Sequence, residues 1–156
     1  MIRLTTIAAI CLAFGITVAS TAIAEHAAAT ASFEQHLWTY NAQVVSIYDG
    51  DTIRLDVDLG FSQRSMGVAI RLAGLDAPEI RGIEKPQGVL SRDWLIAQIP
   101  PGTWIILKTK KDRNHRDRQE KYGRYLGVIQ MPDGSILNDT MIADGFAVPY
   151  MLERSD

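Results

Sequence analysis

The sequence predicts a small, mainly β domain of the α+β class, and three observations support this fold class. Apolar and polar residues alternate over 53–59, which is typical of a half-buried strand. Other runs rich in β-branched and aromatic residues are separated by turn-forming residues, as expected for short strands. One stretch, 86–99, has apolar residues at helical spacing. The domain therefore consists of several short strands and few helices.

Three strands are expected in the first half of the domain. Residues 38–48 form the first strand, which ends at the turn Asp49-Gly50. The second strand has Ile53, Leu55, Val57 and Leu59 on one face and Arg54, Asp56 and Asp58 on the other. A polar loop is expected over 60–67 and the third strand over 68–75.

One helix follows the third strand. It covers 86–99, with a proline in its first turn, and Leu90, Trp94 and Ala97 lie on one side. Pro100-Pro101-Gly102 ends this helix because proline cannot continue the hydrogen-bond pattern.

The second half of the domain contributes two more strands, over 103–109 and 122–131. Asn138 or Asp139 can cap a short C-terminal helix that ends at Gly145. Five strands with one helix between the third and the fourth are typical of a five-stranded Greek-key barrel of the OB-fold type.

The first 24 residues are predicted to be a signal peptide. Residues 4–19 carry no charge, and Ala22-Ile23-Ala24 matches a cleavage site. Cleavage would leave a flexible leader, 25–36, and the barrel domain, 37–156, in an exported protein that is secreted or periplasmic. A retained membrane anchor is the alternative, but the apolar run is short for a span and lacks a strong basic flank. Cys11 is the only cysteine, so the processed protein would contain no disulfide.

The charge distribution is uneven. The full chain has a net charge of −2, yet the stretch 108–124 contains eight basic residues and three acidic ones. A local basic stretch on a mildly acidic protein is compatible with binding to nucleic acid. The alternative is an ordinary solvated loop.

Three short motifs carry the candidate functional residues. Asp49-Gly50-Asp51-Thr52 could bind a metal ion or simply form a tight turn. The segment 71–79 contains an arginine on an apolar strand, where a charge needs a partner or a ligand, and two acids that flank Pro78. In Lys121-Tyr122-Gly123-Arg124-Tyr125, the glycine allows a ligand to approach the backbone.

Together, in their order and spacing, the motifs resemble the pattern of the staphylococcal nuclease (thermonuclease) family: D-G-D-T, R-L-x-x-x-D-x-P-E and K-Y-G-R. The resemblance extends from about Gln43 to Tyr150 and includes every charged member of the pattern. It implies an OB-fold domain with calcium-dependent phosphodiesterase activity on DNA and RNA. It also implies loss of the 5′-oxygen after attack by water, which leaves 3′-phosphate ends.

The resemblance also implies a role for each residue of the motifs. Asp51, Asp76 and the backbone carbonyl of Ala77 would bind Ca²⁺, and Asp49 would support the turn. Arg71, Glu79 and Arg124 would be catalytic, the arginines on the scissile phosphate and the glutamate on the attacking water. Lys121 and Tyr122 would contact a neighbouring phosphate and Tyr150 a base. No stable protein partner is expected, and the protein would act as a monomer on single-stranded or frayed DNA and RNA.

The chemistry of phosphodiester hydrolysis explains these residue types. Calcium takes oxygen ligands in variable number, guanidinium groups bind phosphate oxygens through parallel hydrogen bonds, and a carboxylate can activate water. Two other classes remain open from the sequence. The domain could be a non-catalytic OB module that binds nucleic acid or protein, or an exported OB domain that binds another small ligand. The complete set of charged residues favours the enzyme.

Overall fold

The computed structural model describes residues 37–111, 114, 116–120 and 122–150. The predicted signal peptide (1–24) and leader (25–36) lie outside the described residues, as does the candidate site residue Lys121. Within the described part of the chain, no helix is long and apolar enough to cross a membrane.

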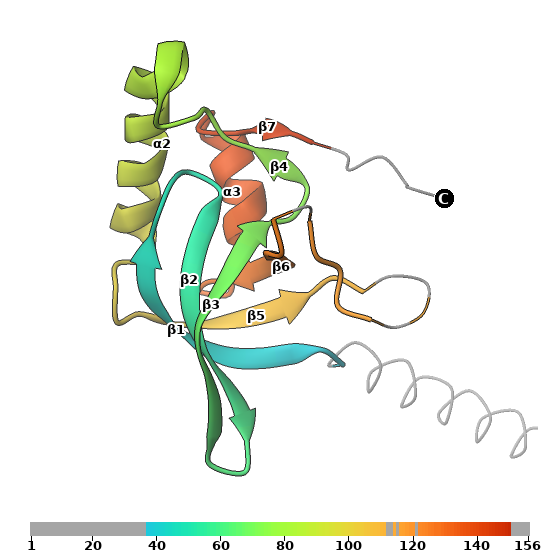
Figure 1. Cartoon of the computed structure of the whole chain (residues 1–156). Coiled ribbons are helices and arrows are strands. Elements are labelled where there is room, and N and C mark those ends of the chain that lie inside the picture. The colour runs from blue at the N-terminus through green and yellow to red at the C-terminus, as the bar shows by residue number, and fades with distance from the viewer. Residues whose placement is uncertain (1–36, 112–113, 115, 121, 151–156) are drawn as a thin grey trace, which may run out of the picture. The chain divides into compact units, whose positions relative to one another are not determined.

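Five strands form a closed barrel in which neighbours follow the order β1-β2-β3-β6-β5 and β5 pairs again with β1 (Figure 1). The pairs are antiparallel except β3 with β6, which is parallel. The barrel strands are β1 (Thr39–Ile47), β2 (Thr52–Gly60), β3 (Gln63–Leu72), β5 (Trp104–Thr109) and β6 (Tyr125–Gln130). The predicted five-stranded OB-type barrel is therefore confirmed.

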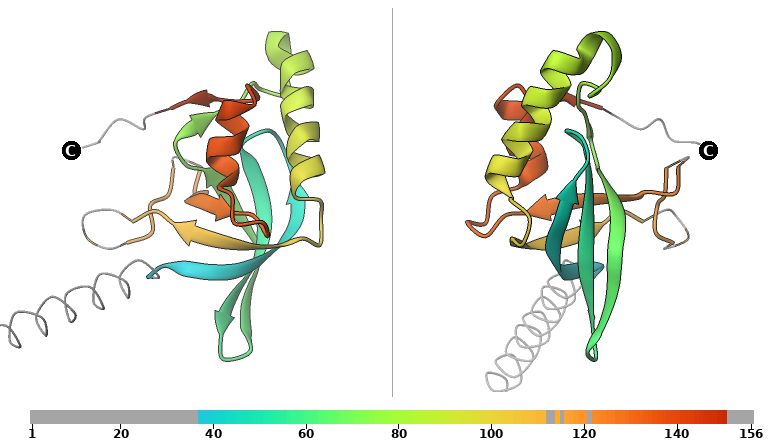
Figure 2. Two further views of the ribbon diagram at one scale, coloured as in Figure 1. Left: turned by 180° about the vertical axis from the view of Figure 1, so that it is seen from behind. Right: turned by 60° about the vertical axis from the view of Figure 1, so that its left-hand side comes forward.

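The remaining elements connect the barrel strands or follow them. The 3₁₀ turn η1 (Gly82–Glu84) and the helix α2 (Lys85–Gln98) lie between the third and fourth barrel strands, and α3 (Leu137–Ala143) follows the fifth, as predicted. Two short strands, β4 (Leu75–Asp76) and β7 (Val148–Pro149), pair with each other outside the barrel. Figure 2 shows both helices at the same end of the barrel, opposite the tip of the β2–β3 hairpin.

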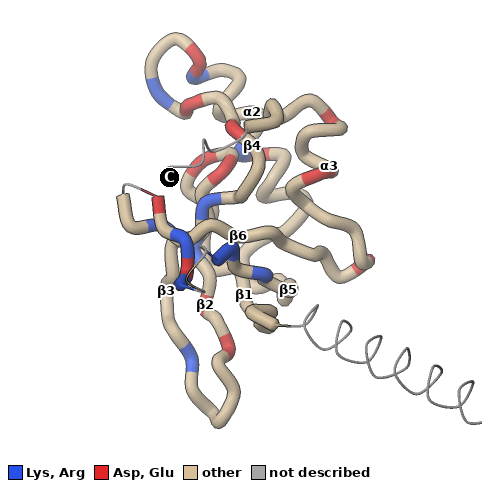
Figure 3. Tube along the Cα trace, turned by 90° about the vertical axis from the view of Figure 1, so that its right-hand side faces the viewer, with Lys and Arg blue, Asp and Glu red and all other residues tan. Residues whose placement is uncertain are grey.

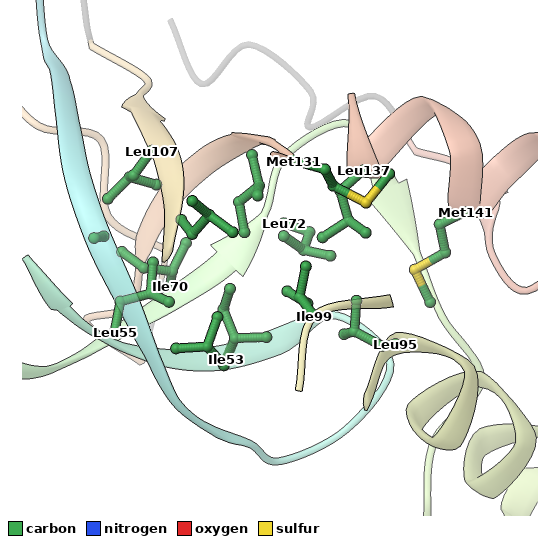
Figure 4. Close-up of a cluster of buried hydrophobic side chains, with 14 of the residues drawn as sticks. Ile53, Leu55, Ile70, Leu72, Leu95, Ile99, Leu107, Met131, Leu137 and Met141 are labelled. Atoms are coloured by element: carbon green, nitrogen blue, oxygen red, sulfur yellow. The ribbon is translucent and has the colours of Figure 1, made fainter. Parts of the chain in front are cut away.

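The core fills the barrel and continues between the barrel and its helices. Strand alternation points one face of each strand inward, and the helices add residues at the helical end. Fully buried side chains come from β2 and β3 (Ile53, Leu55, Ile70, Leu72), from α2 and the residue after it (Leu95, Ile99) and from α3 (Leu137, Met141) (Figure 4). Each large apolar side chain buried in this way stabilises the fold by about 1.5–3 kcal/mol.

The predicted polar loop over 60–67 is wrong. β2 and β3 keep pairing through this region to a two-residue turn at Phe61-Ser62, so the hairpin extends beyond the barrel core. Polar side chains support the extension: Asp56 Oδ1 accepts the backbone N–H of Gly67 (2.7 Å). Leu59, expected on the apolar face, is half-exposed because it lies on the part of β2 that extends beyond the core.

The predicted face of α2 is also wrong. Leu90 and Ala97 are exposed, and the buried residues of the helix are Gly88, Ser91 and Leu95. Trp94 is partly buried, as its ring stacks on Phe146 at a centroid distance of 5.2 Å. A helix that packs closely on backbone needs small residues at the contact, and this is the reason that a glycine and a serine occupy the buried face.

The last third of the chain brings two further corrections. The fifth barrel strand begins at Tyr125 rather than at residue 122, so Arg124 precedes the strand instead of lying inside it. Asn138 does not cap α3, which already begins at Leu137. Its buried amide accepts the backbone N–H of Ile129 (3.0 Å) and donates to the carbonyl of Ala73 (2.9 Å), so it joins α3 to two other segments.

Candidate active site

The first motif forms a tight turn between β1 and β2. The backbone N–H of Tyr48 donates to the carbonyl of Thr52 (2.9 Å), and the backbone N–H of Asp51 donates to Asp49 Oδ1 (3.1 Å). Asp49, Asp51 and Thr52 are all buried. Two neighbouring carboxylates are thus held away from water at the start of β2, which is costly without charged or hydrogen-bonding partners.

Two glycines bring α2 into close contact with both site segments. A Cβ at Gly50 would lie 2.6 Å from Ser91 Oγ and 2.7 Å from Ala77 Cβ. A Cβ at Gly88 would lie 2.3 Å from the carbonyl oxygen of Glu79. Because no side chain fits at either position, glycine allows the helix, the turn before β2 and the segment after β4 to meet.

Arg71 connects the first two motifs. It lies opposite Thr52 in the β2–β3 register, and its side chain is only 14% exposed. One guanidinium nitrogen, Nη1, donates to Asp51 Oδ2, and Nη2 donates to Asp76 Oδ1 (2.6 Å). Carboxylates from the turn before β2 and from β4 therefore converge on one cation.

The environment of Asp51 favours a nearby positive charge. Burial is the main cause of a raised pKa for this carboxyl group, the positive charge of Arg71 opposes that rise, and the negative charge of Asp49 adds to it. The Oδ1 atom also accepts the hydroxyl of Thr52 (2.9 Å). A further cation beside Asp51 would stabilise its charged form.

Arg124 belongs to the same network. Its Nε donates to Glu120 Oε1 (2.9 Å), and its Nη1 donates to Thr52 Oγ1 (2.5 Å). Since the Thr52 hydroxyl in turn donates to Asp51, the contacts run without a break from Glu120 through both arginines to Asp76. One hydrogen-bond network thus joins residues that lie more than 40 positions apart in the sequence.

The third motif forms a turn that orients the side chain of Arg124. The Glu120 side chain accepts the backbone N–H of Tyr122 (2.9 Å), and the backbone N–H of Glu120 donates to the carbonyl of Arg124 (3.0 Å). The hydrogen bond from Arg124 is the main cause of a lowered pKa for Glu120. The guanidinium lies 5.6 Å from the centre of the Tyr122 ring, which is exposed. Lys121, between these residues, is not described.

The other candidate residues lie around this network. Ala77 lies beside Gly50, since a Cβ added at Gly50 would be 2.7 Å from the Cβ of Ala77. Glu79 is exposed, and its backbone N–H donates to Glu84 Oε2 (3.1 Å). Tyr150 follows β7 and donates its backbone N–H to the carbonyl of Gly74 (2.9 Å). It therefore lies next to β4, the strand that contains Asp76. Of the described candidates, Glu79 and Tyr150 have no side-chain contact with the network.

Opposite charges are concentrated in this region. Figure 3 shows Lys or Arg segments beside Asp or Glu segments between β4 and the chain before β6, in agreement with the ion pairs of Arg71 and Arg124. Described residues of the basic stretch make contacts of their own. Lys111 is paired with Asp117 and lies 4.2 Å from the centre of the Trp38 ring.

The donor set of the site fits a hard cation. Two carboxylates converge on Arg71, Ala77 lies beside the turn that carries Asp51, and carboxylate and carbonyl oxygens are the donors that Ca²⁺ prefers. No three His, Cys, Asp or Glu side chains in the described part of the chain lie close enough together to hold a metal. The two carboxylates would therefore supply only part of a calcium coordination shell, with the backbone, water and a phosphate oxygen completing it.

Two members of the network were not identified from the sequence. Thr52 stands in the first motif but was assigned no role, and Glu120 was counted only among the acids of the basic stretch. The signal for Glu120 is a carboxylate four residues before an arginine, which usually indicates a helical pair. In the structure these two residues lie in a turn and not in a helix. A search for helical ion pairs would therefore identify the right partner from a wrong assumption about the local structure.

Comparison with known proteins supports the family resemblance. Residues 69–156, more than half of the chain, match the model of the family described as Staphylococcal nuclease homologue. Uncharacterized endonucleases of Escherichia coli and of Escherichia coli O157:H7 are each 30% identical over 116 residues, which cover 74% of this chain. Endonuclease YhcR of Bacillus subtilis (strain 168) is 29% identical over 122 residues, which cover 72% of this chain.

The chain spans only part of each relative. The matched region makes up 65% of the two E. coli proteins and 9% of YhcR. The family model, the order of the three motifs and the OB-type barrel agree with one another. This chain is a member of the staphylococcal nuclease homologue family.

Proposed function

We propose that this protein is a nuclease that hydrolyses phosphodiester bonds of DNA and RNA. The observation that carries this proposal is the single network in which Arg71 and Arg124 lie beside the carboxylates of Asp51 and Asp76. A scissile phosphate needs cationic groups around its oxygens as charge develops in the transition state. The relatives named endonucleases support the same class of activity.

We infer that Ca²⁺ is the cofactor. Asp51, Asp76 and the carbonyl of Ala77 would hold it, because they offer the hard oxygen donors that this ion takes. When bound, the ion neutralises charge on the phosphate and favours attack by water. The buried carboxyl of Asp51, with its raised pKa, is the ligand whose charge such an ion would stabilise most.

The residues of the chain itself divide the remaining work. Each arginine uses some of its five N–H groups within the network and presents the others to the phosphate. Glu79, exposed at the edge of the site, accepts a proton from the attacking water. A bond forms between that water oxygen and phosphorus, the bond to the 5′-oxygen breaks, and this oxygen takes up a proton from solvent, so the products are a 3′-phosphate and a 5′-hydroxyl.

The test is incubation of the purified protein with single-stranded DNA and RNA in Ca²⁺, in Mg²⁺ and in excess chelator, followed by analysis of the ends. We expect 3′-phosphate products with Ca²⁺, little cleavage with Mg²⁺ because it requires stricter octahedral geometry, and none with chelator. Full activity in chelator would refute the metal requirement, and 5′-phosphate products would refute the assigned leaving group.

Glu79→Gln separates an enzyme from a binding module. The substitution keeps the size of the side chain and removes the base, so we expect unchanged thermal stability, retained oligonucleotide binding and a cleavage rate at least tenfold lower. If the unaltered protein binds oligonucleotides but never cuts them, the domain is a non-catalytic OB module.

We further propose that residues 1–24 direct export and are then removed, and that the remaining chain acts as a monomer. The motivation is the uncharged run 4–19 before Ala22-Ile23-Ala24. Mass spectrometry of the exported protein should give Glu25 as the first residue. An intact N-terminus in the membrane fraction would instead indicate a retained anchor.

A further inference from the structure

Tyr48 and Arg81 form an exposed pair at the edge of the site. Arg81 Nη2 donates to the hydroxyl of Tyr48 (3.2 Å), which joins the segment before β2 to the segment after Glu79. The Tyr48 side chain is large, aromatic and 53% exposed, and Arg81 is exposed as well. The proposed reaction uses neither residue.

The barrel order places this pair on one flank of the site. Tyr48 follows β1, Asp51 precedes β2, Arg71 is in β3 and Arg124 precedes β6, which are consecutive neighbours in the barrel. The register keeps them at the same end, since Thr52 lies opposite Arg71 and Arg71 opposite the second residue of β6. Counted along the barrel wall through β2 and β3, three strand spacings of about 4.8 Å separate the Tyr48 segment from the Arg124 segment, or roughly 14 Å.

The two flanks carry the same chemistry. On one side, the Arg124 guanidinium lies 5.6 Å from the centre of the exposed Tyr122 ring. On the other side, Arg81 donates a hydrogen bond to the hydroxyl of Tyr48. Among the described residues, Arg81 forms no ion pair with a carboxylate, whereas Arg71 and Arg124 do. Its positive charge is therefore available to an anion from solvent.

Single-stranded nucleic acid is the ligand that matches an exposed ring beside a cation. Bases stack on aromatic side chains, cations follow the backbone, and an OB fold typically contacts about 4–16 nucleotides. Arg71 and Arg124 alone would bind little more than one phosphate. A longer strand would continue past them, and on the flank of Tyr48 it would meet an exposed aromatic ring.

We propose that Tyr48 and Arg81 form a second nucleotide subsite, on the opposite side of the scissile phosphate from Tyr122. The ring of Tyr48 stacks on a base, and Arg81 binds the phosphate of that nucleotide. This subsite rests on the proposed nuclease function and deepens it, because it sets how long a substrate must be for full affinity.

The test is a series of oligothymidylates from two to eight nucleotides, cleaved by the wild type and by Tyr48→Ala, Arg81→Ala and the double variant. For the wild type, we expect KM to fall as the strand becomes long enough to reach the pair. The double variant should lose about tenfold of that gain on the longest substrate and change less than twofold on the shortest. Its kcat should be unchanged.

Three variants serve as controls. Tyr48→Phe keeps the ring and should retain most of the affinity, while Arg81→Lys should rescue part of it. Arg92→Ala removes a partly exposed arginine from α2, where it pairs with Asp93, and should leave the length dependence unchanged. Melting temperatures show whether each variant is folded.

Equal losses at every substrate length would mean that the pair only supports the turn before β2, and no loss at any length would mean that the strand does not pass over it. Either result overturns the subsite. If the wild type cleaves no oligonucleotide of any length, the proposed nuclease function has failed instead.

Discussion

The two ends of the β2–β3 hairpin differ from the usual distribution of polar and apolar residues in opposite ways. Polar side chains are buried at one end, and apolar side chains are exposed towards the other. At the barrel end, the side chains of Asp51, Thr52 and Arg71 are largely buried, and each forms a hydrogen bond with another of the three. Towards the far end, the apolar side chain of Phe61 in the turn is 99% exposed, and Met66, further along β3, is exposed as well. Buried polar groups require partners, whereas an exposed apolar group does not. Substitutions should therefore be costly at the first end and tolerated at the second.

The largest effect is expected for Arg71→Lys. Lysine keeps the charge but replaces a planar fork with a point contact, so it cannot hold Asp51 and Asp76 together and also bind a phosphate. We expect kcat to fall about 10²–10³-fold, as is typical when one preorganised group is lost from a transition-state site. Steady-state kinetics at two ionic strengths measure the loss, which should not depend on salt.

Arg54→Lys is the matched control for that change. Arg54 lies on the same hairpin, but its Nη1 donates to the carbonyl of Gly67 at an exposed position away from the network. We expect less than a twofold change in kcat. Similar, salt-sensitive losses in both variants would show that Arg71 contributes only general electrostatic attraction, and the binding-module interpretation would then be preferred.

Gly88→Ala tests whether the close approach of α2 positions the site. In an open helix, alanine in place of glycine would stabilise the fold by about 1 kcal/mol. Here the new Cβ would lie 2.3 Å from a backbone carbonyl oxygen, which cannot move aside cheaply. We expect the clash to dominate and to lower the free energy of unfolding by about 1–3 kcal/mol. The neighbouring Gln87→Ala, at an exposed position, should change it by less than about 0.5 kcal/mol.

An increase in stability for Gly88→Ala would mean that the helix can move away from the Glu79 segment. Cleavage activity distinguishes positioning from stability alone. We expect the folded variant to lose activity at temperatures well below its melting transition, because the displaced carbonyl is that of Glu79.

The sequence was sufficient for the barrel and for most of the network, because both depend on regular patterns. Alternation in β2 and the turn residues around it determine which residues face inward, and the motif order matched a known family. The face of α2 was not predictable from apolar spacing. Leu90 fits the helical pattern, yet Gly88 and Ser91 are buried because the helix packs against backbone, which hydrophobicity does not reveal.

The hairpin extension and the role of Glu120 were missed for a related reason. The residues over 60–67 are polar and glycine-rich, as in many loops, but a strand pair that is solvated on both faces needs no apolar alternation. Glu120 supports Arg124 through a turn, and the Arg124 side chain also contacts the distant Thr52. Such long-range contacts leave no periodic signal in the sequence.

Glu120→Ala is expected to have an intermediate effect. Glu120 orients Arg124 and has only 10% of its side chain exposed, so removing it should let the guanidinium rotate and should lower kcat about tenfold. Glu120→Gln keeps an acceptor and should recover part of the rate. In an Arg124→Ala background, Glu120→Ala should cause no further loss, since the glutamate acts through the arginine. Additive losses in the double variant would show that Glu120 acts independently.

The same ion pair has a predictable pH dependence. The pKa of Glu120 in the folded protein lies below its ordinary value of 4.5, mainly because of the hydrogen bond from Arg124. Its contribution to stability is therefore complete above about pH 4.5 and is lost as the pH falls through the lowered folded-state pKa. Chemical denaturation across this range should show the wild type and Glu120→Gln converging at low pH. A stability difference that does not change with pH would exclude this linkage.

The smallest effect on activity is expected at the far end of the hairpin. Phe61 and Ser62 form a two-residue turn in which both have positive φ (52° and 61°), a geometry that favours Asn-Gly. Non-glycine residues in this region are strained, so the double substitution Phe61→Asn with Ser62→Gly should raise the free energy of unfolding by about 1 kcal/mol. Cleavage of single-stranded DNA should be unchanged, since the tip lies at the opposite end of β2 from Asp51, about 33 Å along the strand. A loss of activity in a stabilised variant would show that Phe61 itself contacts the substrate. In that case, the exposed apolar tip would have a function that accounts for its strained backbone, and tolerance would no longer distinguish the two ends of the hairpin.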